Sequence, residues 1–384
     1  MNASIIRLGI RRLVRQSPAI RRLAVALCGV GLLATGPLAT APASAKEYLV
    51  TGVKPNGLVV IDPAARKVDK IHRIPGGGVA PGTIVPSPDG KIAYVITNHL
   101  DSVSGIDLDS GKEVFRANFS SGTERVKAMF GMDISPDGKE LFVFQAPVRL
   151  LPGEYKVEDT RIAVFRTADG VGAKAVRTFP APRRVAVLAF SKDGGTLWAL
   201  GWDLYAMDPK TGAIRDTHKL LNWTRDNFGP PDILDVWPQF EQAAVFSTPY
   251  FTSRTDLPPT DPSAFKTGML TLDLASGTVA TKEFEDTSAV IFSSVVNPAK
   301  RGEAFSVYTQ LSKIDAAGGA LVKRVDLPHT YYSINIAGDG KEVYVGGTAC
   351  DIGVYHPDSL DRIGQIEIPG CPDQGVASLR MVKR

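Results

Sequence analysis

The residue types that most often carry chemistry in proteins are sparse in this sequence of 384 residues. Its five histidines form no H-x-x-x-H pair, and its three cysteines form no C-x-x-C-H haem motif. It contains no G-x-S-x-G nucleophile elbow, and the glycines at 76–78 precede no Lys-Ser/Thr pair of a phosphate loop. We therefore expect this chain to hold no catalytic residue, no metal ion and no cofactor of its own.

Residues 1–45 have the composition of an export signal rather than of a folded domain. They contain six arginines and no Lys, Asp or Glu, with an apolar run at 23–34 and an Ala-Ser-Ala end at 43–45. This order is typical of a cleaved secretory signal, and about a dozen apolar residues are too few to span a bilayer comfortably. We expect a periplasmic protein whose folded domain is 46–384, with a retained anchor as the alternative.

Removing that segment changes the charge balance. The whole sequence has 44 Lys+Arg against 40 Asp+Glu, a net charge of +4, whereas without the six arginines the net charge is about −2. A slightly acidic chain gives no reason to expect binding to a phosphate backbone. We therefore expect no nucleic acid partner and, once the signal is removed, no membrane span.

Two cysteines remain in the expected domain, Cys350 and Cys371. In an oxidising compartment an even number of cysteines favours a disulfide, and on the chain-entropy model a loop of this length contributes about 3 kcal/mol. We expect these two residues to be bonded, with two free thiols as the alternative.

Short runs rich in Val, Ile, Phe, Tyr and Thr, bounded by Gly, Pro, Asp or Asn, predict strands and turns through the rest of the chain. Ser-Pro-Asp-Gly turns occur at 87–90 and 135–138, with looser copies elsewhere. A second signature, an apolar strand ending at a turn that usually starts with Asp, recurs every 41–65 residues. Because a four-stranded propeller blade needs about 40–50 residues, we predict an all-β, seven-bladed β-propeller. These turns fall at positions 62, 107, 166, 208, 273, 315 and 356.

The two ends of the domain predict how the ring closes. The first unit opens at 48–50, already in the register of a second strand, and the C-terminus supplies a spare strand at 376–382. We predict that this last strand becomes the innermost strand of blade one, which removes the free edges of the ring. The alternative is a two-domain β-sandwich protein, which does not explain regular spacings.

Two insertions lengthen blades three and five, at 145–160 and 248–267. Both fall between the second and third strands, so we expect both loops on the end of the ring where one blade connects to the next. Long loops in compact domains are usually functional, and aromatic and Arg residues on such loops are typical anchors of protein interfaces. The residues that we expect at a partner interface are Arg125, Arg149, Tyr250, Phe251, Arg254, His329, Tyr331 and Tyr332.

Other functions remain open at this point. Asp133 and Asp235 are the clearest carboxylates on strands expected to line the central channel, and neither has an evident partner. They keep open a stand-alone propeller hydrolase, such as a lactonase. A generic periplasmic interaction scaffold is a further alternative.

Four segments carry a resemblance to a known family. They are ERVKAMFG at 124–131 followed by SPDGK, APVRL at 146–150, YFTSR at 250–254 with Asp-Pro at 261–262, and LPHTYYS at 327–333. They resemble the β subunit of quinohemoprotein amine dehydrogenase, and the likeness runs along nearly the whole expected domain. The family fold is a seven-bladed propeller.

The resemblance implies a heterotrimeric periplasmic enzyme that oxidises a primary amine to an aldehyde and ammonia. In that family, a large subunit carries two c-type haems and a small subunit carries a cysteine tryptophylquinone. The β subunit holds no redox cofactor, and it forms part of the wall around the small subunit. The resemblance therefore implies a non-catalytic platform with a dihaem cytochrome c and a quinone-bearing small subunit as partners. It does not account for the Cys350–Cys371 pair.

Overall fold

The computed structural model describes residues 45–233, 237–375 and 378–384. They belong to one compact unit, Ala45–Arg384. The expected export signal therefore lies almost wholly outside the described residues, as does Asp235. Within the described part of the chain, no helix is long and apolar enough to cross a membrane.

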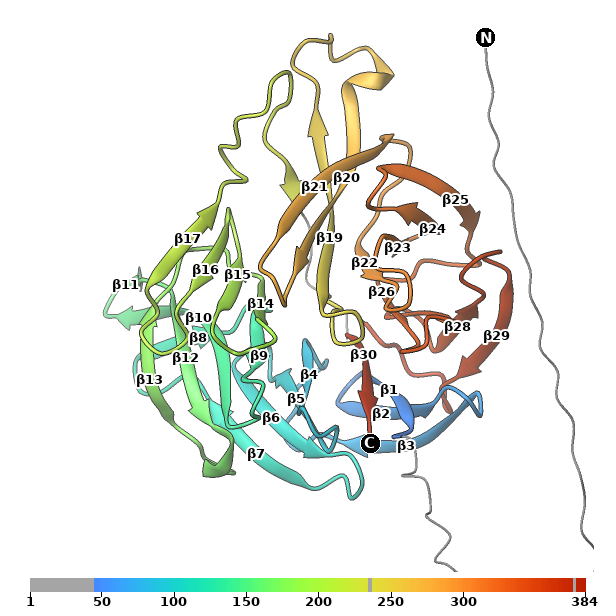
Figure 1. The fold of residues 1–384 in the computed structure, drawn as a ribbon. Helices are drawn as coiled ribbons and strands as arrows, with labels where there is room; N and C mark the ends of the chain where they lie inside the picture. Colours follow the sequence, from blue (N-terminus) through green and yellow to red (C-terminus); the bar gives the residue numbers. More distant parts are fainter. Residues whose placement is uncertain (1–44, 234–236, 376–377) are drawn as a thin grey trace, which may run out of the picture. The chain divides into compact units, whose positions relative to one another are not determined.

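The strands of the described residues form seven antiparallel sheets arranged as the blades of a ring (Figure 1). This confirms the seven-bladed β-propeller. Each blade has four strands in order from the channel outward, and blade three has two more. Blades one to four contain β1 (Glu47–Val53), β2 (Gly57–Asp62), β3 (Lys67–Arg73) with β30 (Leu379–Lys383); β4 (Ile84–Pro86), β5 (Ile92–Thr97), β6 (Ser102–Asp107), β7 (Glu113–Asn118); β8 (Glu124–Lys127), β9 (Met132–Ile134), β10 (Glu140–Leu151), β11 (Glu154–Val157), β12 (Arg161–Arg166), β13 (Ala175–Pro180); and β14 (Val187–Phe190), β15 (Leu197–Leu200), β16 (Leu204–Met207), β17 (Ile214–His218).

Blades five to seven complete the ring, and two short 3-10 helices, η1 (Thr167–Asp169) and η2 (Pro262–Ala264), lie in loops. The strands of these blades are β18 (Asp232–Ile233), β19 (Val245–Ser253), β20 (Phe265–Asp273), β21 (Val279–Asp286); β22 (Ser293–Val296), β23 (Glu303–Val307), β24 (Gln310–Asp315), β25 (Ala320–Asp326); and β26 (Ser333–Ile336), β27 (Val343–Gly346), β28 (Asp351–Tyr355), β29 (Arg362–Glu367).

The Ser-Pro-Asp-Gly turns join the first strand of a blade to the second. In blade two the Ser87 hydroxyl donates to the Asp89 carboxylate at 2.6 Å and accepts from the backbone N–H of Ile92 at 2.9 Å. Gly90 supplies the positive φ of +68° that the turn needs. The same side-chain bonds recur in blades three and four, so a four-residue motif builds the same turn three times.

The second signature joins the third strand of a blade to the fourth. In blade four, one oxygen of Asp208 accepts the backbone N–H groups of Lys210 and Thr211 at 2.7 and 3.0 Å. These N–H bonds hold the pKa of Asp208 at about 2. The same aspartate-capped turn forms at Asp107 and Asp273, which explains why the motif marks the blades in the sequence.

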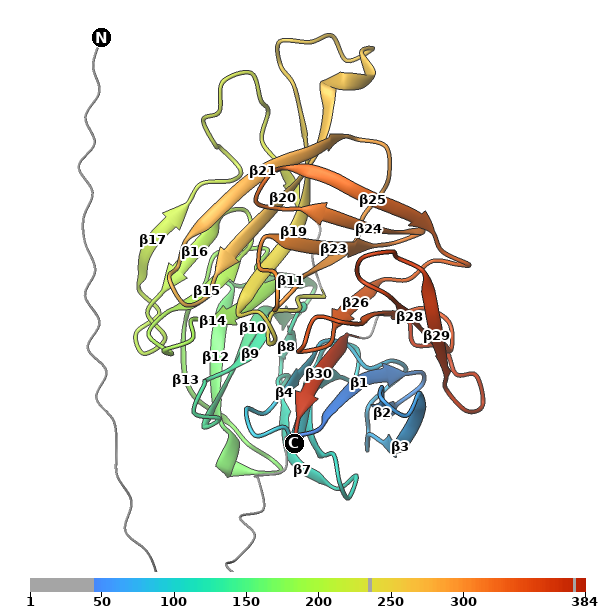
Figure 2. The same cartoon turned by 45° about the vertical axis from the view of Figure 1, so that its right-hand side comes forward.

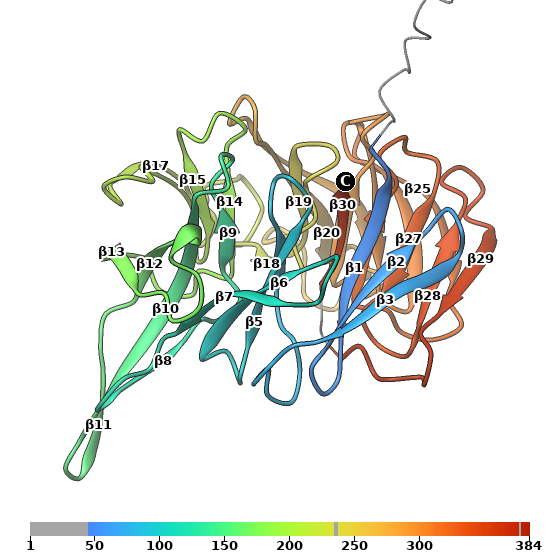
Figure 3. The same cartoon turned by 90° about the horizontal axis from the view of Figure 1, so that it is seen from below.

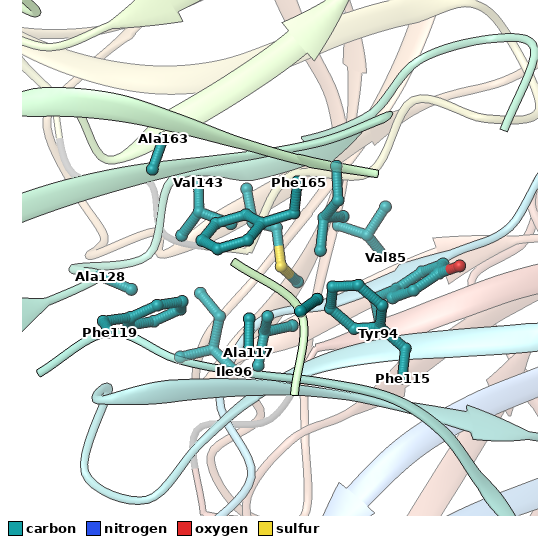
Figure 4. Close-up of a cluster of buried hydrophobic side chains, with 14 of the residues drawn as sticks. Val85, Tyr94, Ile96, Phe115, Ala117, Phe119, Ala128, Val143, Ala163 and Phe165 are labelled. Carbon is teal, nitrogen blue, oxygen red and sulfur yellow. The ribbon is translucent and has the colours of Figure 1, made fainter. Parts of the chain in front are cut away.

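The hydrophobic core lies mainly between neighbouring blades. Figure 4 shows Tyr94 and Phe115 of blade two beside Val143 and Phe165 of blade three. The rings of Tyr94 and Phe115 meet edge to face, with centroids 5.6 Å apart. Because both faces of a blade are covered, the middle strands are buried along nearly their whole length.

Ring closure follows the prediction. β30 pairs with β1 over five positions, from Glu47–Lys383 to Thr51–Leu379, and Figures 1 and 2 show the red C-terminal strand beside the blue first strand. The strand begins at Leu379, and the start predicted at 376 lies outside the described residues. Between blades seven and one, Arg66 forms an ion pair with Glu342.

Candidate functional site

The connections between blades and the hairpins between second and third strands lie at one end of the ring, which we call the connection face. The turns between first and second strands lie at the other end, the turn face. In blade three the Ala181 N–H, on the connection to blade four, donates to Thr160, which follows the insertion. In blade five the Gly229 N–H, on the connection from blade four, donates to Ser253. Both insertions therefore belong to the connection face, as expected.

The blade-three insertion is a β-hairpin rather than a loop. β10 continues to Leu151, turns at Gly153 and returns as β11, while β8 pairs with its other edge. Figure 3 shows this three-stranded extension standing away from the ring. Residues 148–151 and 154–157 satisfy one another's backbone groups as a strand pair, so most of this insertion between the second and third strands is itself strand.

The blade-five insertion also lengthens two strands before it forms a loop. β19 and β20 stay paired from Val245–Asp273 out to Ser253–Phe265. The remaining loop is closed by η2, where the Asp261 side chain accepts the Ser263 N–H at 2.9 Å.

Two of the residues expected at a partner interface are buried core residues. Tyr250 is 0% exposed and donates to Glu283 at 2.6 Å, and Tyr331 is 0% exposed and donates to Asp351 at 2.8 Å. Burial raises the pKa of both phenols. The expectation that these rings lie on the surface was wrong, because each sits between blades with its hydroxyl bonded to a carboxylate.

His329 and Tyr332 are half-buried beside them. The two ring nitrogens of His329 lie 2.8 Å from Asp351 Oδ1 and 2.9 Å from the Thr330 carbonyl oxygen. Tyr332 stacks on Trp237 with centroids 5.5 Å apart. Phe251 is also half-buried.

The predicted arginines are more accessible. Arg125 is exposed and donates to the backbone carbonyls of Gly122 and Glu124 at 3.0 and 3.3 Å. Arg149 pairs with Glu158 at 2.9 Å on the hairpin. Arg254 pairs with Asp256 at the start of the blade-five loop.

Exposed apolar residues accompany these arginines on blades three and four. Tyr155 and Val157 of the hairpin are 79% and 62% exposed, and Trp202 of blade four is 43% exposed. The guanidinium of Arg184 lies 3.8 Å from the centre of the Trp202 ring. The sequence did not single out Tyr155 and Val157, because their short strand lies inside the insertion at 145–160, which was expected to be a loop. In the strand register, Tyr155 and Val157 share one face of the hairpin with Arg125, whereas Arg149 points to the other face. The blade 3–4 patch is Arg125, Tyr155 and Val157 on the hairpin with Arg184 and Trp202 on blade four.

The predicted disulfide between Cys350 and Cys371 is present. It lies on the connection face of blade seven and lines a cavity of about 800 Å³ together with His329, Asp351 and Arg362.

At the turn face, the channel is partly filled by the segment after β18. The Gln239 side chain, 0% exposed, accepts from Asn335 of β26 at 3.0 Å, and Glu241 forms an ion pair with Arg380 of β30. Arg380 is 1% exposed, and its Nη1 donates to the Ile84 carbonyl at 2.9 Å. Desolvation lowers its pKa to about 10.

Asp133 of β9 lines the same region, as expected of a channel carboxylate. Its two oxygens accept the backbone N–H groups of Ile134 and Phe190 at 2.9 and 2.7 Å, and burial raises its pKa to about 6. The described residues pair it with no second carboxylate, and they contain no group of three or more His, Cys, Asp or Glu that could hold a metal ion. Those residues therefore show no lactonase-like centre at Asp133.

The fold and these surfaces define a seven-bladed propeller with two candidate sites. No family model and no curated protein matches the sequence. The chain is similar to solved structures that include Kuenenia stuttgartiensis hydrazine synthase, at 16% identity and a TM-score of 0.57, covering 86% of this chain and 100% of that one. It is also similar to a functionally unknown protein from Desulfotomaculum acetoxidans DSM 771, at 11% identity and a TM-score of 0.55, covering 88% and 99%. At these identities the similarity shows the fold alone.

Proposed function

We propose that this chain is a cofactor-free, partner-binding subunit of a periplasmic oxidoreductase complex of the quinohemoprotein amine dehydrogenase type. The partners would be a dihaem cytochrome c subunit and a small subunit that carries a cysteine tryptophylquinone. The partners would oxidise a primary amine and carry away its electrons. This chain would be the platform that helps enclose the quinone-bearing subunit.

The blade 3–4 patch is the observation that carries the proposal. Trp, Tyr and Arg residues are the types most enriched at the centres of protein interfaces, and here they lie exposed in a monomer. The hairpin that holds Tyr155 and Val157 contacts few other parts of the chain, and its outer strand β11 has four exposed residues. A partner strand or loop laid along it would bury that apolar surface.

The charges of the patch indicate the chemistry of the partner surface. Arg125 bonds only to backbone carbonyls, and Arg184 lies on Trp202; the described residues give neither a carboxylate. Two guanidinium groups without anionic partners favour an acidic counterpart. Arg149, by contrast, is already paired with Glu158.

The experiment is affinity capture with tagged residues 46–384 from the periplasm of the organism that encodes this chain. We expect the captured complex to show c-type haem absorbance and to reduce a dye when a primary amine is added, whereas the chain alone does neither. Arg184→Ala should weaken capture, and Arg215→Ala on the outer strand of blade four is the matched control. Amine turnover by the isolated chain, or capture without a haem protein, would contradict the proposal.

A further inference from the structure

The mouth of the channel at the turn face holds buried polar atoms without partners. Among the described residues, the Gln242 amide has no hydrogen-bond partner for either Nε2 or Oε1, and Arg380 has none for Nε. Arg380 is 1% exposed, so this N–H is cut off from bulk water. Glu241 Oε1 contacts Arg380 as an ion pair but also accepts no hydrogen bond from the described residues. Buried donors and acceptors in native proteins almost always have partners, which points to a bound molecule here.

There is room for such a molecule beside these groups. Arg380 and Gln242 line a cavity of about 360 Å³, together with Val85, Ile134 and Phe240. A second cavity of about 380 Å³ shares Gln242, Ile134 and Phe240 with the first. Both volumes fall in the range of small-molecule sites, and the walls combine apolar side chains with polar and charged ones, among them Asp133, Glu241 and Gln242.

The charges facing the cavity are largely compensated. Arg380 is paired with Glu241, and the Asp133 carboxylate accepts two backbone N–H bonds. Lys383, at the rim, is paired with Glu47 at 3.1 Å. A ligand with a full charge would lose its hydration without gaining a free counter-ion, whereas a neutral polar ligand avoids that cost.

We propose that the channel mouth binds a small carboxamide on an apolar body. Gln242 presents a free donor beside a free acceptor, and another amide is the neutral group that complements both, with its N–H donating to Oε1 and its carbonyl accepting from Nε2. The ligand carbonyl can also accept from Arg380 Nε. The Phe240, Ile134 and Val85 side chains contact the apolar body.

Benzamide is the test probe, titrated into the full-length domain by calorimetry or ligand-observed NMR. Methyl benzoate has nearly the same size and accepts a hydrogen bond but donates none. We expect saturable binding of benzamide and affinity at least about tenfold lower for methyl benzoate, since that ligand leaves Oε1 unpaired. This comparison uses the unaltered protein and does not depend on the folding of a variant.

Gln242→Met keeps the length of the side chain and removes both amide atoms. We expect it to weaken benzamide binding at least about tenfold, whereas Gln310→Met, at the edge of blade six, leaves the affinity unchanged. Equal affinities for benzamide and methyl benzoate would overturn the proposal. So would the absence of saturable benzamide binding, which would mean that the cavity holds only water.

Discussion

The two ends of the propeller use arginine in opposite ways. On the connection face, Arg125 and Arg184 are accessible and have no carboxylate partner among the described residues, and Arg184 stacks on the exposed Trp202 ring. On the turn face, the buried Arg380 forms an ion pair with Glu241 and interacts electrostatically with Asp133. The first arrangement leaves charge available to a macromolecular partner. The second uses most of the charge within the ring, in the Arg380–Glu241 ion pair, and leaves the Gln242 amide and Arg380 Nε for a ligand.

Arg380→Met should have the largest effect on stability. It removes the buried cation of the Arg380–Glu241 ion pair, whose charge also acts on the buried Asp133, and breaking a buried pair costs about 3–5 kcal/mol of unfolding free energy. Arg125→Met on the opposite face should cause no measurable loss. Urea unfolding of both variants measures the difference, and a similar result for the two would erase the contrast between the faces.

Asp133 should make the free energy of unfolding depend on pH. Its folded pKa of about 6 lies above its ordinary 3.8, so the folded chain holds this proton more tightly than the unfolded chain. The protonated Asp133 therefore contributes to the free energy of unfolding, on the order of 3 kcal/mol in total. This contribution is fully present below about pH 4 and is lost as the pH rises through 6. Urea unfolding from pH 4 to 7 should show this slope, and Asp133→Asn should abolish it. If Asp133→Asn keeps the same pH dependence of unfolding, another titratable group causes it.

The disulfide should stabilise the connection face of blade seven. It joins residues 21 positions apart, so replacing Cys350 and Cys371 with Ser should lower the free energy of unfolding by about 3 kcal/mol. A reducing agent should lower the melting temperature of the unaltered chain and leave the double variant unchanged. Equal sensitivity of both proteins to the reductant would contradict this role.

Trp202→Ala should affect association rather than folding. An exposed Trp at the centre of an interface contributes about 2 kcal/mol, which is about a 30-fold loss of affinity. The melting temperature should change little, because Trp202 is 43% exposed and its ring stacks with the exposed Arg184. Ile363→Ala, exposed on the outer strand of blade seven, is the control for affinity. A large loss of melting temperature with intact assembly would make Trp202 a structural residue.

The fold was predictable because short, repeated sequence motifs form its turns. The Ser87 and Asp208 turns depend on bonds within five residues of the chain, so their motifs mark the blades wherever they occur. The site was less predictable. Tyr250 and Tyr331 read as surface aromatics but are buried, because Glu283 and Asp351, 33 and 20 residues away, supply their hydroxyl partners.

The sequence by itself determined the seven blades, their closure by the C-terminal strand and the disulfide, because each follows from short-range turn chemistry, strand count or cysteine count. Only the tertiary structure decided which rings and charges reach the surface. Arg380 lies 139 residues after Glu241 and 247 after Asp133. The three groups meet only because the inner strands β9 and β30 and the turn that holds Glu241 converge on one channel. Tyr155 is exposed because its hairpin extends beyond the ring, which no local pattern encodes.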